Sequence, residues 1–320
     1  MPATRGSFHA LLTDRAWPDT AIERGILEPA GIEVVEAAAT SEAALCAMAA
    51  DADAIITNWA GVTPAVVRAA RRCRVICRTG IGLDNISVAT ATELKIPVTN
   101  VPDYCVGEVA DHALALLLAC ARKIAFFHAR TKHGEYRLQS GPAMPRLAGK
   151  RLGLVGLGRI GRNLAGKARA LGLEAIAHTA SGNDHGTGCR MLALDELLVE
   201  SDFVSLHAPL TPATRHLLSL PQFEKMKRSA YLINTARGGL IDHAGLWQAL
   251  ERNLLAGAAL DVFDPEPPDL ATPLMQHERV IVTPHAAFAS VESLIELRTR
   301  VARQVVDVLS GRRPENVVNP

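Results

Sequence analysis

Short apolar runs alternate with helix-like stretches along the first hundred residues of the chain. In three segments the pattern is helix-like, and short apolar runs separate these segments. The runs predicted as strands are 9–14, 32–37, 54–59, 75–80 and 97–101, the predicted helices are 22–27, 41–50 and 63–71, and a short segment at 89–94 joins the last two strands. Such alternation with compact connections predicts parallel strands joined by crossover helices, and therefore a complete α/β unit.

A second series of strands begins near residue 151. The predicted strands are 151–156, 175–179, 203–209, 231–236, 257–263 and 280–285, which suffice for a doubly wound parallel sheet. Ahead of them one long helix is predicted from Val106 to about His133, with a Leu- and Ala-rich centre that can pack under a sheet or against another subunit. A closing amphipathic helix, Val291–Leu309, is expected to return to the first unit.

The stretch 151–171 combines an apolar run, a glycine turn and a helical pattern. Gly156, Gly158 and Gly161 form GxGxxG: the first glycine permits the turn, the second lets backbone approach a pyrophosphate, and the third lets the helix pack on the strand. Glycine-rich turns also occur in loops that bind nothing, but here apolar residues flank the turn at the required spacings. The stretch therefore predicts a dinucleotide site with phosphates at the helix N-terminus.

Charge and cysteine usage narrow the class of protein. The 320 residues include 34 Lys plus Arg and 33 Asp plus Glu, a net charge of +1 that gives no reason to expect nucleic acid or an acidic membrane as partner. We expect no signal segment and no membrane span. The six scattered cysteines are expected to be free thiols. Cys73 and Cys77 have a spacing that occurs in metal sites, but the sequence offers no second His/Cys pair to complete such a site. These features predict a cytoplasmic protein without a metal site.

Three polar residues follow predicted strands, which is where ligands bind in open parallel sheets. They are Arg237 in NTARGGLID, Glu266 in DPEPP and His285 in VIVTPH. Each has a plain alternative: a surface ion-pair partner, a rigid exposed turn and a core histidine, respectively. The two glycines after Arg237 suggest backbone held close to a ligand, and the three residues together with a dinucleotide turn favour an active site.

The chemistry of hydride transfer explains these residue types. Transfer between nicotinamide and a carbonyl changes the charge on oxygen, so a proton must move with the hydride, and histidine can carry it. A carboxylate beside His285 favours the protonated imidazolium. The planar guanidinium of Arg237 can hold a carboxylate or carbonyl in a fixed pose, which lysine cannot do.

From Ala54 to Pro320 the chain resembles the D-isomer-specific 2-hydroxyacid dehydrogenases, the family that includes D-3-phosphoglycerate dehydrogenase and the C-terminal-binding proteins. The stretches that carry the resemblance are RTGIGLDNI, NVPDYCVGEVADHAL, GLVGLGRIGR, LHAPLTPATRHLL, NTARGGLIDHAGL, ALDVFDPEPP and TPHAAF. The motifs RTGIGLDNI, NVPDYC and TPHAAF look closest to those of bacterial C-terminal-binding-protein-like members. The resemblance implies NAD(P)(H), a 2-keto or 2-hydroxy acid substrate, and a homodimer built on the helix that begins at Val106.

The resemblance also implies a role for each matching residue. Arg237 would bind substrate, and Glu266 would pair with His285, the acid/base. Substrate-binding residues would be Arg78, Gly80, Ile81 and Gly82, with Arg78 either meeting an anionic tail or simply pairing on the surface. Cofactor-binding residues would be Gly156, Gly158, Arg159, Ile160, Gly161, His178, Thr179, Ser181, His207, Ala208, Pro209, Thr214, Thr235, Ala236, Asp261, His285 and Ala287.

The family fold implies two Rossmann-like domains. A discontinuous, smaller flavodoxin-like substrate domain would comprise 1–102 and 288–320. A continuous dinucleotide-binding domain would comprise 103–287.

One position departs from the family pattern. Members that prefer NAD carry Asp at the end of the second strand, about 20 residues past the first glycine, to hold the ribose hydroxyls. Here that stretch reads AIAHTASG, with Thr179 in place of the acid. His178, Thr179 and Ser181 can donate to a 2′-phosphate, although no Arg is adjacent. The departure indicates a slight lean toward NADP or dual use.

The predicted function is NAD(P)-dependent interconversion of a 2-keto acid and a D-2-hydroxy acid. D-3-phosphoglycerate is an alternative substrate, although the chain ends without an added regulatory domain and short versions of that enzyme exist. A cofactor-sensing scaffold like the C-terminal-binding proteins is a rival from another class. A formate-dehydrogenase-like enzyme is disfavoured because that group is expected to carry Gln rather than Glu266.

Overall fold

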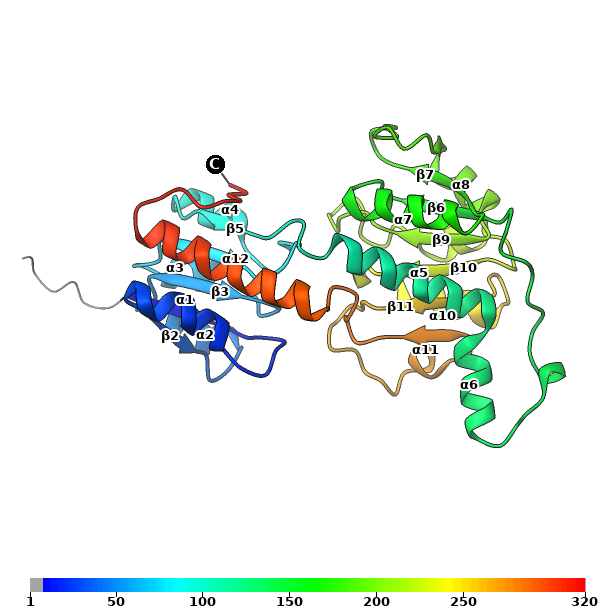
Figure 1. Ribbon diagram of the computed structural model, residues 1–320, viewed down its shortest axis with the longest axis horizontal. Coiled ribbons are helices and arrows are strands. Elements are labelled where there is room, and N and C mark those ends of the chain that lie inside the picture. Colours follow the sequence, from blue (N-terminus) through cyan, green and yellow to red (C-terminus); the bar gives the residue numbers. More distant parts are fainter. Residues whose placement is uncertain (1–7, 320) are drawn as a thin grey trace, which may run out of the picture. The chain divides into compact units, whose positions relative to one another are not determined.

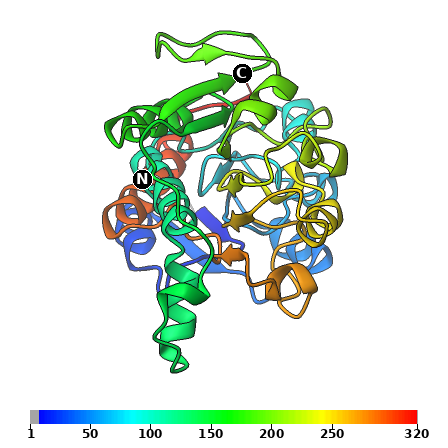
Figure 2. The same cartoon turned by 90° about the vertical axis from the view of Figure 1, so that its right-hand side faces the viewer.

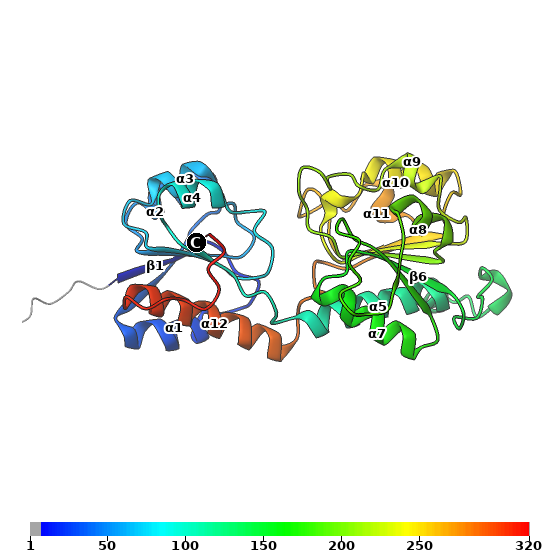
Figure 3. The same cartoon turned by 90° about the horizontal axis from the view of Figure 1, so that it is seen from above.

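The computed structural model describes residues 8–319, which form two compact units. The first unit contains the chain up to Tyr104 and takes it up again from Ser290, whereas the second is the continuous segment Cys105–Ala289. Each unit is a parallel sheet between two layers of helices (Figure 3). The predicted α/β class with a doubly wound parallel sheet is confirmed.

The first unit has five parallel strands in the order β2-β1-β3-β4-β5. In Figure 3, α1 and α12 cover one face of this sheet, and α2, α3 and α4 cover the other. The closing helix α12 has the predicted bounds and packs on α1 and β4. The elements are β1 (Phe8–Leu12), α1 (Ala21–Leu27), a 3-10 turn (Glu28–Ala30), β2 (Ile32–Glu36), α2 (Glu42–Ala49), β3 (Ala54–Thr57), α3 (Pro64–Ala69), β4 (Val75–Arg78), α4 (Val88–Glu93), β5 (Val98–Thr99) and α12 (Val291–Leu309).

The second unit has seven parallel strands in the order β12-β11-β10-β9-β6-β7-β8. The strand order reverses between β6 and β9, as in doubly wound nucleotide-binding sheets. The elements are α5 (Val106–Arg122), α6 (Ile124–Lys132), a 3-10 turn (Leu138–Ser140), β6 (Arg151–Val155), α7 (Arg159–Ala170), β7 (Glu174–His178), β8 (Arg190–Met191), α8 (Leu194–Glu200), β9 (Phe203–Leu206), α9 (Leu220–Phe223), β10 (Tyr231–Asn234), a 3-10 turn (Gly238–Leu240), α10 (His243–Glu251), β11 (Gly257–Leu260), α11 (Pro273–Gln276) and β12 (Val280–Val282).

Both faces of the second sheet are buried, which explains why its strands read as continuous apolar runs. Figure 3 shows α5 and α7 on one face and α8, α9, α10 and α11 on the other. Side chains of β6 alternate between the two cores: Leu152 and Leu154 pack with α5 and α7, and Val155 packs on the opposite face. This two-sided core holds the carboxyl ends of the strands in register.

The prediction of one helix from Val106 to about His133 is wrong. The chain forms two helices, because Lys123 adopts a left-handed conformation with φ 56° and caps α5 through its N–H to the carbonyls of Ala119 and Cys120. The apolar face of α5 packs under the sheet, as one of the two alternatives expected, whereas α6 has no buried residue. In Figures 1 and 2, α6 extends away from the rest of the second unit.

Candidate active site

The predicted cofactor residues lie along one edge of the second sheet. Because all strands are parallel, the residues that follow them share the carboxyl edge, in the order set by the strands. His285 follows β12, Glu266 follows β11, Arg237 follows β10, the glycine turn follows β6 and Thr179 follows β7. Five strand spacings separate β12 from β7, or about 24 Å at ~4.8 Å each. An extended ligand can therefore reach from the histidine to the threonine along this edge.

The glycine turn has the geometry expected for a phosphate-binding loop. Gly156 has φ +99°, and a Cβ there would lie 2.6 Å from the carbonyl carbon of His207. A Cβ on Gly161 would lie 2.4 Å from the carbonyl oxygen of Gly156, so α7 packs on the strand end without room for a side chain. Gly158, the N-cap of α7, has open space beside it. The middle glycine thus leaves a cradle in front of the N-terminus of α7.

These environments predict different outcomes for two alanine substitutions. Gly158→Ala should fold like the parent but bind NADH and NADPH at least about tenfold more weakly, because its methyl group fills the cradle. Gly161→Ala should lower the free energy of unfolding by about 2 kcal/mol, because its methyl group overlaps the Gly156 carbonyl. Urea denaturation and fluorescence titration with each cofactor measure the two effects. Equal cofactor affinity in Gly158→Ala and the parent would contradict the cradle assignment.

The segment after β9 lies against the glycine turn. Gly156 contacts the backbone of His207 and Ala208. His207 accepts or donates a hydrogen bond at Nε2 with Ser205 Oγ at 2.9 Å, and burial lowers its pKa to about 4, so its imidazole is neutral. Thr214 Oγ1 donates to the carbonyl of Pro209 at 2.7 Å and closes the following turn.

The edge also contains a buried hydroxyl without a protein partner. Thr235, at the end of β10, is 8% exposed, and its Oγ1 has no hydrogen-bond partner among residues 8–319. A buried polar group without a partner is costly, so a bound polar ligand would satisfy it. Together with the open cradle at Gly158, this hydroxyl shows that the residues present fit a dinucleotide.

The end of β7 carries no acid that could hold ribose hydroxyls. Thr179 follows the strand directly, and its Oγ1 lies 3.4 Å from Ser181 Oγ. His178 uses Nδ1 on the carbonyl of Leu192 at 3.0 Å, which leaves Nε2. The acid of the following loop, Asp184, accepts from the Gly186 and Gly188 amides. Those backbone hydrogen bonds lower the pKa of Asp184, so its charge serves its own loop.

Arg237 is held by the turn that follows β10. The fully buried Asn234, which the sequence analysis did not select, accepts from Ala236 N–H at 3.0 Å and donates to the carbonyl of Arg237 at 2.9 Å. A Cβ on Gly238 would lie 1.9 Å from the carbonyl carbon of Phe263, so the turn is pressed against the segment after β11. The two glycines after Arg237 therefore allow this close approach.

Glu266 and His285 form a direct pair. His285 Nδ1 lies 2.7 Å from Glu266 Oε2, and Glu266 Oε1 accepts from the Phe263 amide at 2.8 Å. Burial alone would raise the pKa of the Glu266 carboxyl. The hydrogen bond and charge of His285, the Phe263 amide and the charge of Arg237 outweigh burial and lower that pKa. The structure thus brings the three predicted catalytic side chains together electrostatically.

Asp261 and Ala287 lie where β11 and β12 end. Asp261 is fully buried, and its two carboxylate oxygens accept from the amides of Ala286 and Ala287, each at 2.9 Å. Thr283, also not selected from the sequence, donates to the same carboxylate. The cofactor role of Asp261 stays a prediction.

In the first unit, the predicted substrate loop follows β4. Arg78 is buried, with 7% of its surface exposed, so the alternative of a surface ion pair is wrong. Its Nη1 donates to Asn58 Oδ1 at 3.4 Å, and the guanidinium packs against Gly80, which has φ +151°. The carbonyl of Ile81 accepts from Asn100 at 2.8 Å. The substrate role of Arg78, Gly80, Ile81 and Gly82 stays a prediction.

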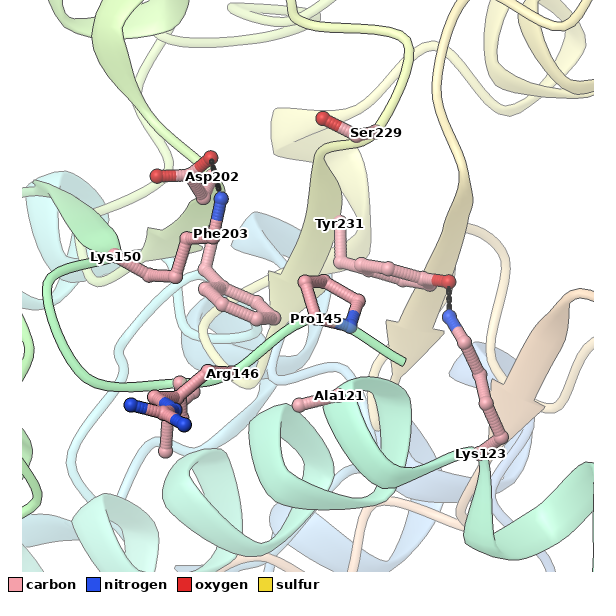
Figure 4. Close-up of a pocket in the computed structure, with 10 residues that line it drawn as sticks. Ala121, Lys123, Pro145, Arg146, Lys150, Asp202, Phe203, Ser229 and Tyr231 are labelled. Atoms are coloured by element: carbon pink, nitrogen blue, oxygen red, sulfur yellow. Dashed lines mark hydrogen bonds and ion pairs between the residues drawn. The ribbon is translucent and has the colours of Figure 1, made fainter. Parts of the chain in front are cut away.

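A small cavity of about 40 Å³ lies at the opposite edge of the second sheet. Phe203 and Tyr231, the first residues of β9 and β10, line it. Figure 4 shows their rings with Pro145 at its centre, and Lys123 and Lys150 on opposite sides. Lys123 donates to the Tyr231 hydroxyl, and Lys150 pairs with Asp202. The cavity is too small and too apolar at its centre to suit a dinucleotide.

A family model described as the NAD-binding domain of the D-isomer-specific 2-hydroxyacid dehydrogenases matches residues 114–287. A D-3-phosphoglycerate dehydrogenase of Methanocaldococcus jannaschii is 39% identical over 299 residues, covering 92% of this chain and 56% of that protein. A glyoxylate reductase of Korarchaeum cryptofilum is 37% identical over 276 residues, covering 84% of this chain and 83% of that protein. The chain thus spans only about half the length of the first relative.

Among solved structures, a D-lactate dehydrogenase from Aquifex aeolicus, determined with NAD and lactic acid, is similar over the whole chain. Its TM-score is 0.86 at 27% sequence identity, with 97% of this chain and 99% of that chain covered. In the part of the chain that the structure describes, no helix combines the length and apolar content needed to cross a membrane.

Proposed function

Because this chain belongs to the D-isomer-specific 2-hydroxyacid dehydrogenase family, a family of NAD(P)-dependent oxidoreductases acting on CH–OH groups, we propose that it interconverts a small 2-keto acid and the D-2-hydroxy acid. The observation that carries the proposal is the His285–Glu266 pair at 2.7 Å, on the same sheet edge as Arg237 and the glycine turn. A pure cofactor sensor has no need of a proton donor there.

Each of the three side chains has a defined task in the reduction. The nicotinamide cofactor, when bound, supplies the hydride. Arg237 binds the substrate carboxylate or carbonyl through its planar guanidinium. His285 donates the Nε2 proton to the carbonyl oxygen, and Glu266 holds the ring by Nδ1 and stabilises its charged form. In the oxidation the same imidazole accepts the proton back. We also propose that the Gly80–Gly82 loop of the first unit is a substrate-binding segment.

The direct test is oxidation of NADH and NADPH with a panel of small 2-keto acids, including glyoxylate, hydroxypyruvate, pyruvate and 3-phosphohydroxypyruvate. We expect turnover with at least one, and the D-configured product from every keto acid whose reduction creates a stereocentre. Tight cofactor binding without turnover of any keto acid would instead favour a cofactor-sensing scaffold.

The same assay measures cofactor preference. The missing acid at Thr179 removes repulsion toward a 2′-phosphate, so kcat/KM for NADPH should equal or exceed that for NADH. Thr179→Asp should shift the ratio toward NADH by at least about tenfold, because a carboxylate repels the phosphate and accepts from ribose hydroxyls. Thr179→Ser is the matched control and should keep the parental ratio. A parent that strongly prefers NADH would overturn this part of the proposal.

We also infer a homodimer that uses α6 and the segment after it. The helix α6 buries none of its residues, and three apolar or aromatic side chains of this region are exposed: Ile124 at 56%, Tyr136 at 91% and Leu138 at 68%. Exposed apolar groups on a projecting element favour a protein partner. Sedimentation should show a dimer, and the double substitution Tyr136→Glu with Leu138→Glu should yield monomers. A monomeric parent would contradict the inference.

A reducing compartment, the cytoplasm, suits the cysteines. All six are free thiols. Burial raises the pKa of Cys73, Cys77 and Cys120 to about 12, which keeps these thiols protonated and unreactive.

A further inference from the structure

The backbone of His285 adopts a conformation that side-chain-bearing residues rarely take. Its φ is +52°, in the left-handed region, so the surrounding structure must hold it there. Asp261 supplies three of the holding contacts, and the carbonyl of Thr283 also accepts from His285 N–H, at 3.1 Å. The carbonyl of Asp261 accepts from His285 N–H at 2.8 Å, and the two carboxylate oxygens of the same residue accept from the next two amides, at Ala286 and Ala287.

This clamp works only if the Asp261 carboxylate keeps one orientation. Each oxygen must face a different amide, and a rotation about the side-chain bond would break both hydrogen bonds. Thr283 opposes that rotation, because its hydroxyl donates to Asp261 Oδ1 at 2.5 Å. Thr283 follows β12, and its own amide donates to the carbonyl of Leu260 at 3.0 Å, so the hydroxyl is attached to the sheet.

The hydroxyl of Thr283 is in turn oriented by a histidine from another element. His112, on α5, places Nε2 3.0 Å from Thr283 Oγ1 and 3.5 Å from Asp261 Oδ1. Because the hydroxyl proton points to Asp261, its oxygen accepts, and His112 Nε2 carries the donated hydrogen. The helix α5 packs against β10 and β11, which fixes the position of this imidazole. The hydrogen bonds therefore run from α5 through Thr283 and Asp261 to the backbone of His285.

We propose that His112 and Thr283 are positioning residues for His285: they fix the carboxylate that holds the two amides directly after His285, and so aim the imidazole. The His285 ring itself contacts Glu266 through Nδ1 and the edge of Phe288, 5.9 Å away between ring centroids. The effect on catalysis rests on the proposed dehydrogenase function. That the network holds the backbone after β12 in place rests only on the hydrogen bonds described above.

The test compares variants that remove and keep the hydroxyl. Thr283→Val should lower kcat about 30-fold through misplacement of the imidazole, with a smaller effect on the Kd for cofactor. Its solvent deuterium isotope effect on kcat should rise, because proton transfer becomes slower. Thr283→Ser should keep most of the parental kcat. His112→Leu removes the donor at the far end of the same hydrogen-bond chain and should also lower kcat. This variant tests the proposal even if Thr283→Val folds poorly.

A second readout is independent of turnover. The ring Cε1–H NMR signal of His285 is identified by its loss in His285→Ala. It should shift in Thr283→Val and His112→Leu but stay in place in Thr283→Ser.

The outcomes separate the two proposals. A kcat for Thr283→Val within twofold of the parent, equal losses in Thr283→Ser and Thr283→Val, or a loss confined to cofactor affinity would each overturn the positioning role. If the parent reduces no keto acid, the dehydrogenase proposal fails, and the NMR comparison alone decides whether the network holds the loop. If the His285 signal stayed in place in both Thr283→Val and His112→Leu, the network would not hold the backbone of His285.

Discussion

His285→Ala should lower kcat for keto acid reduction by about 100- to 10,000-fold, a far larger effect than on cofactor affinity. The imidazole is the proton donor to the carbonyl oxygen, and general acid catalysis contributes an effect of this size. Because Nδ1 is hydrogen-bonded to Glu266 at 2.7 Å, we assign the proton transfer to Nε2. Steady-state kinetics with the best keto acid, together with cofactor titration, measure both parts.

His9→Ala is the control for this substitution. His9 lies on β1 in the first unit and pairs with Glu33 at 3.7 Å, outside the proposed machinery. It should leave kcat within twofold of the parent. If His285→Ala kept turnover within a few fold of the parent, the acid/base assignment would be wrong.

Glu266→Gln adds a pH dependence to the same test. Because the pKa of Glu266 is lowered, its carboxylate stays charged at neutral pH and stabilises the imidazolium. The amide removes this charge, so the pH at which keto acid reduction falls to half on the alkaline side should decrease by about one unit. An unchanged profile would show that Glu266 has no electrostatic effect on the proton donor.

Arg237→Lys should reduce kcat/KM for the keto acid by about 100-fold, or about 2.7 kcal/mol, despite the retained charge. Lysine offers a point charge, whereas the guanidinium offers two parallel donors in one plane to an anion. The turn that holds Arg237, with Asn234 behind it and Gly238 against Phe263, gives this plane a fixed place. Cofactor affinity should change little.

Arg215→Lys serves as the matched control. Arg215 follows β9 near the same edge of the second sheet. Its exposed side chain donates to Asp264 at 2.7 Å. Surface pairs of this kind contribute little, so its kcat/KM should remain within twofold of the parent. Equal, small losses in both arginine variants would remove Arg237 from the substrate site.

Local pattern was a good guide wherever one physical rule determined the outcome. The apolar runs predicted the strands because both faces of each sheet are buried, and the amphipathic pattern gave the bounds of α12 correctly. The pattern failed at Lys123, because a lysine in left-handed conformation has no sequence signal comparable to glycine. For Arg78 the pattern left two alternatives open, and its burial excludes only the surface ion pair.

The sequence by itself determined the fold class, the glycine turn and the residue types at the strand ends, because these depend on short-range spacing and on steric limits at glycine. The pairing of Glu266 with His285 was already implied by the resemblance, and the tertiary structure added its geometry. Only the tertiary structure revealed Asn234, Thr283 and His112 as supports. His112 and Thr283 are 171 positions apart in the chain. Such hydrogen bonds arise because neighbouring strands and a packed helix bring distant residues together, which no local pattern encodes.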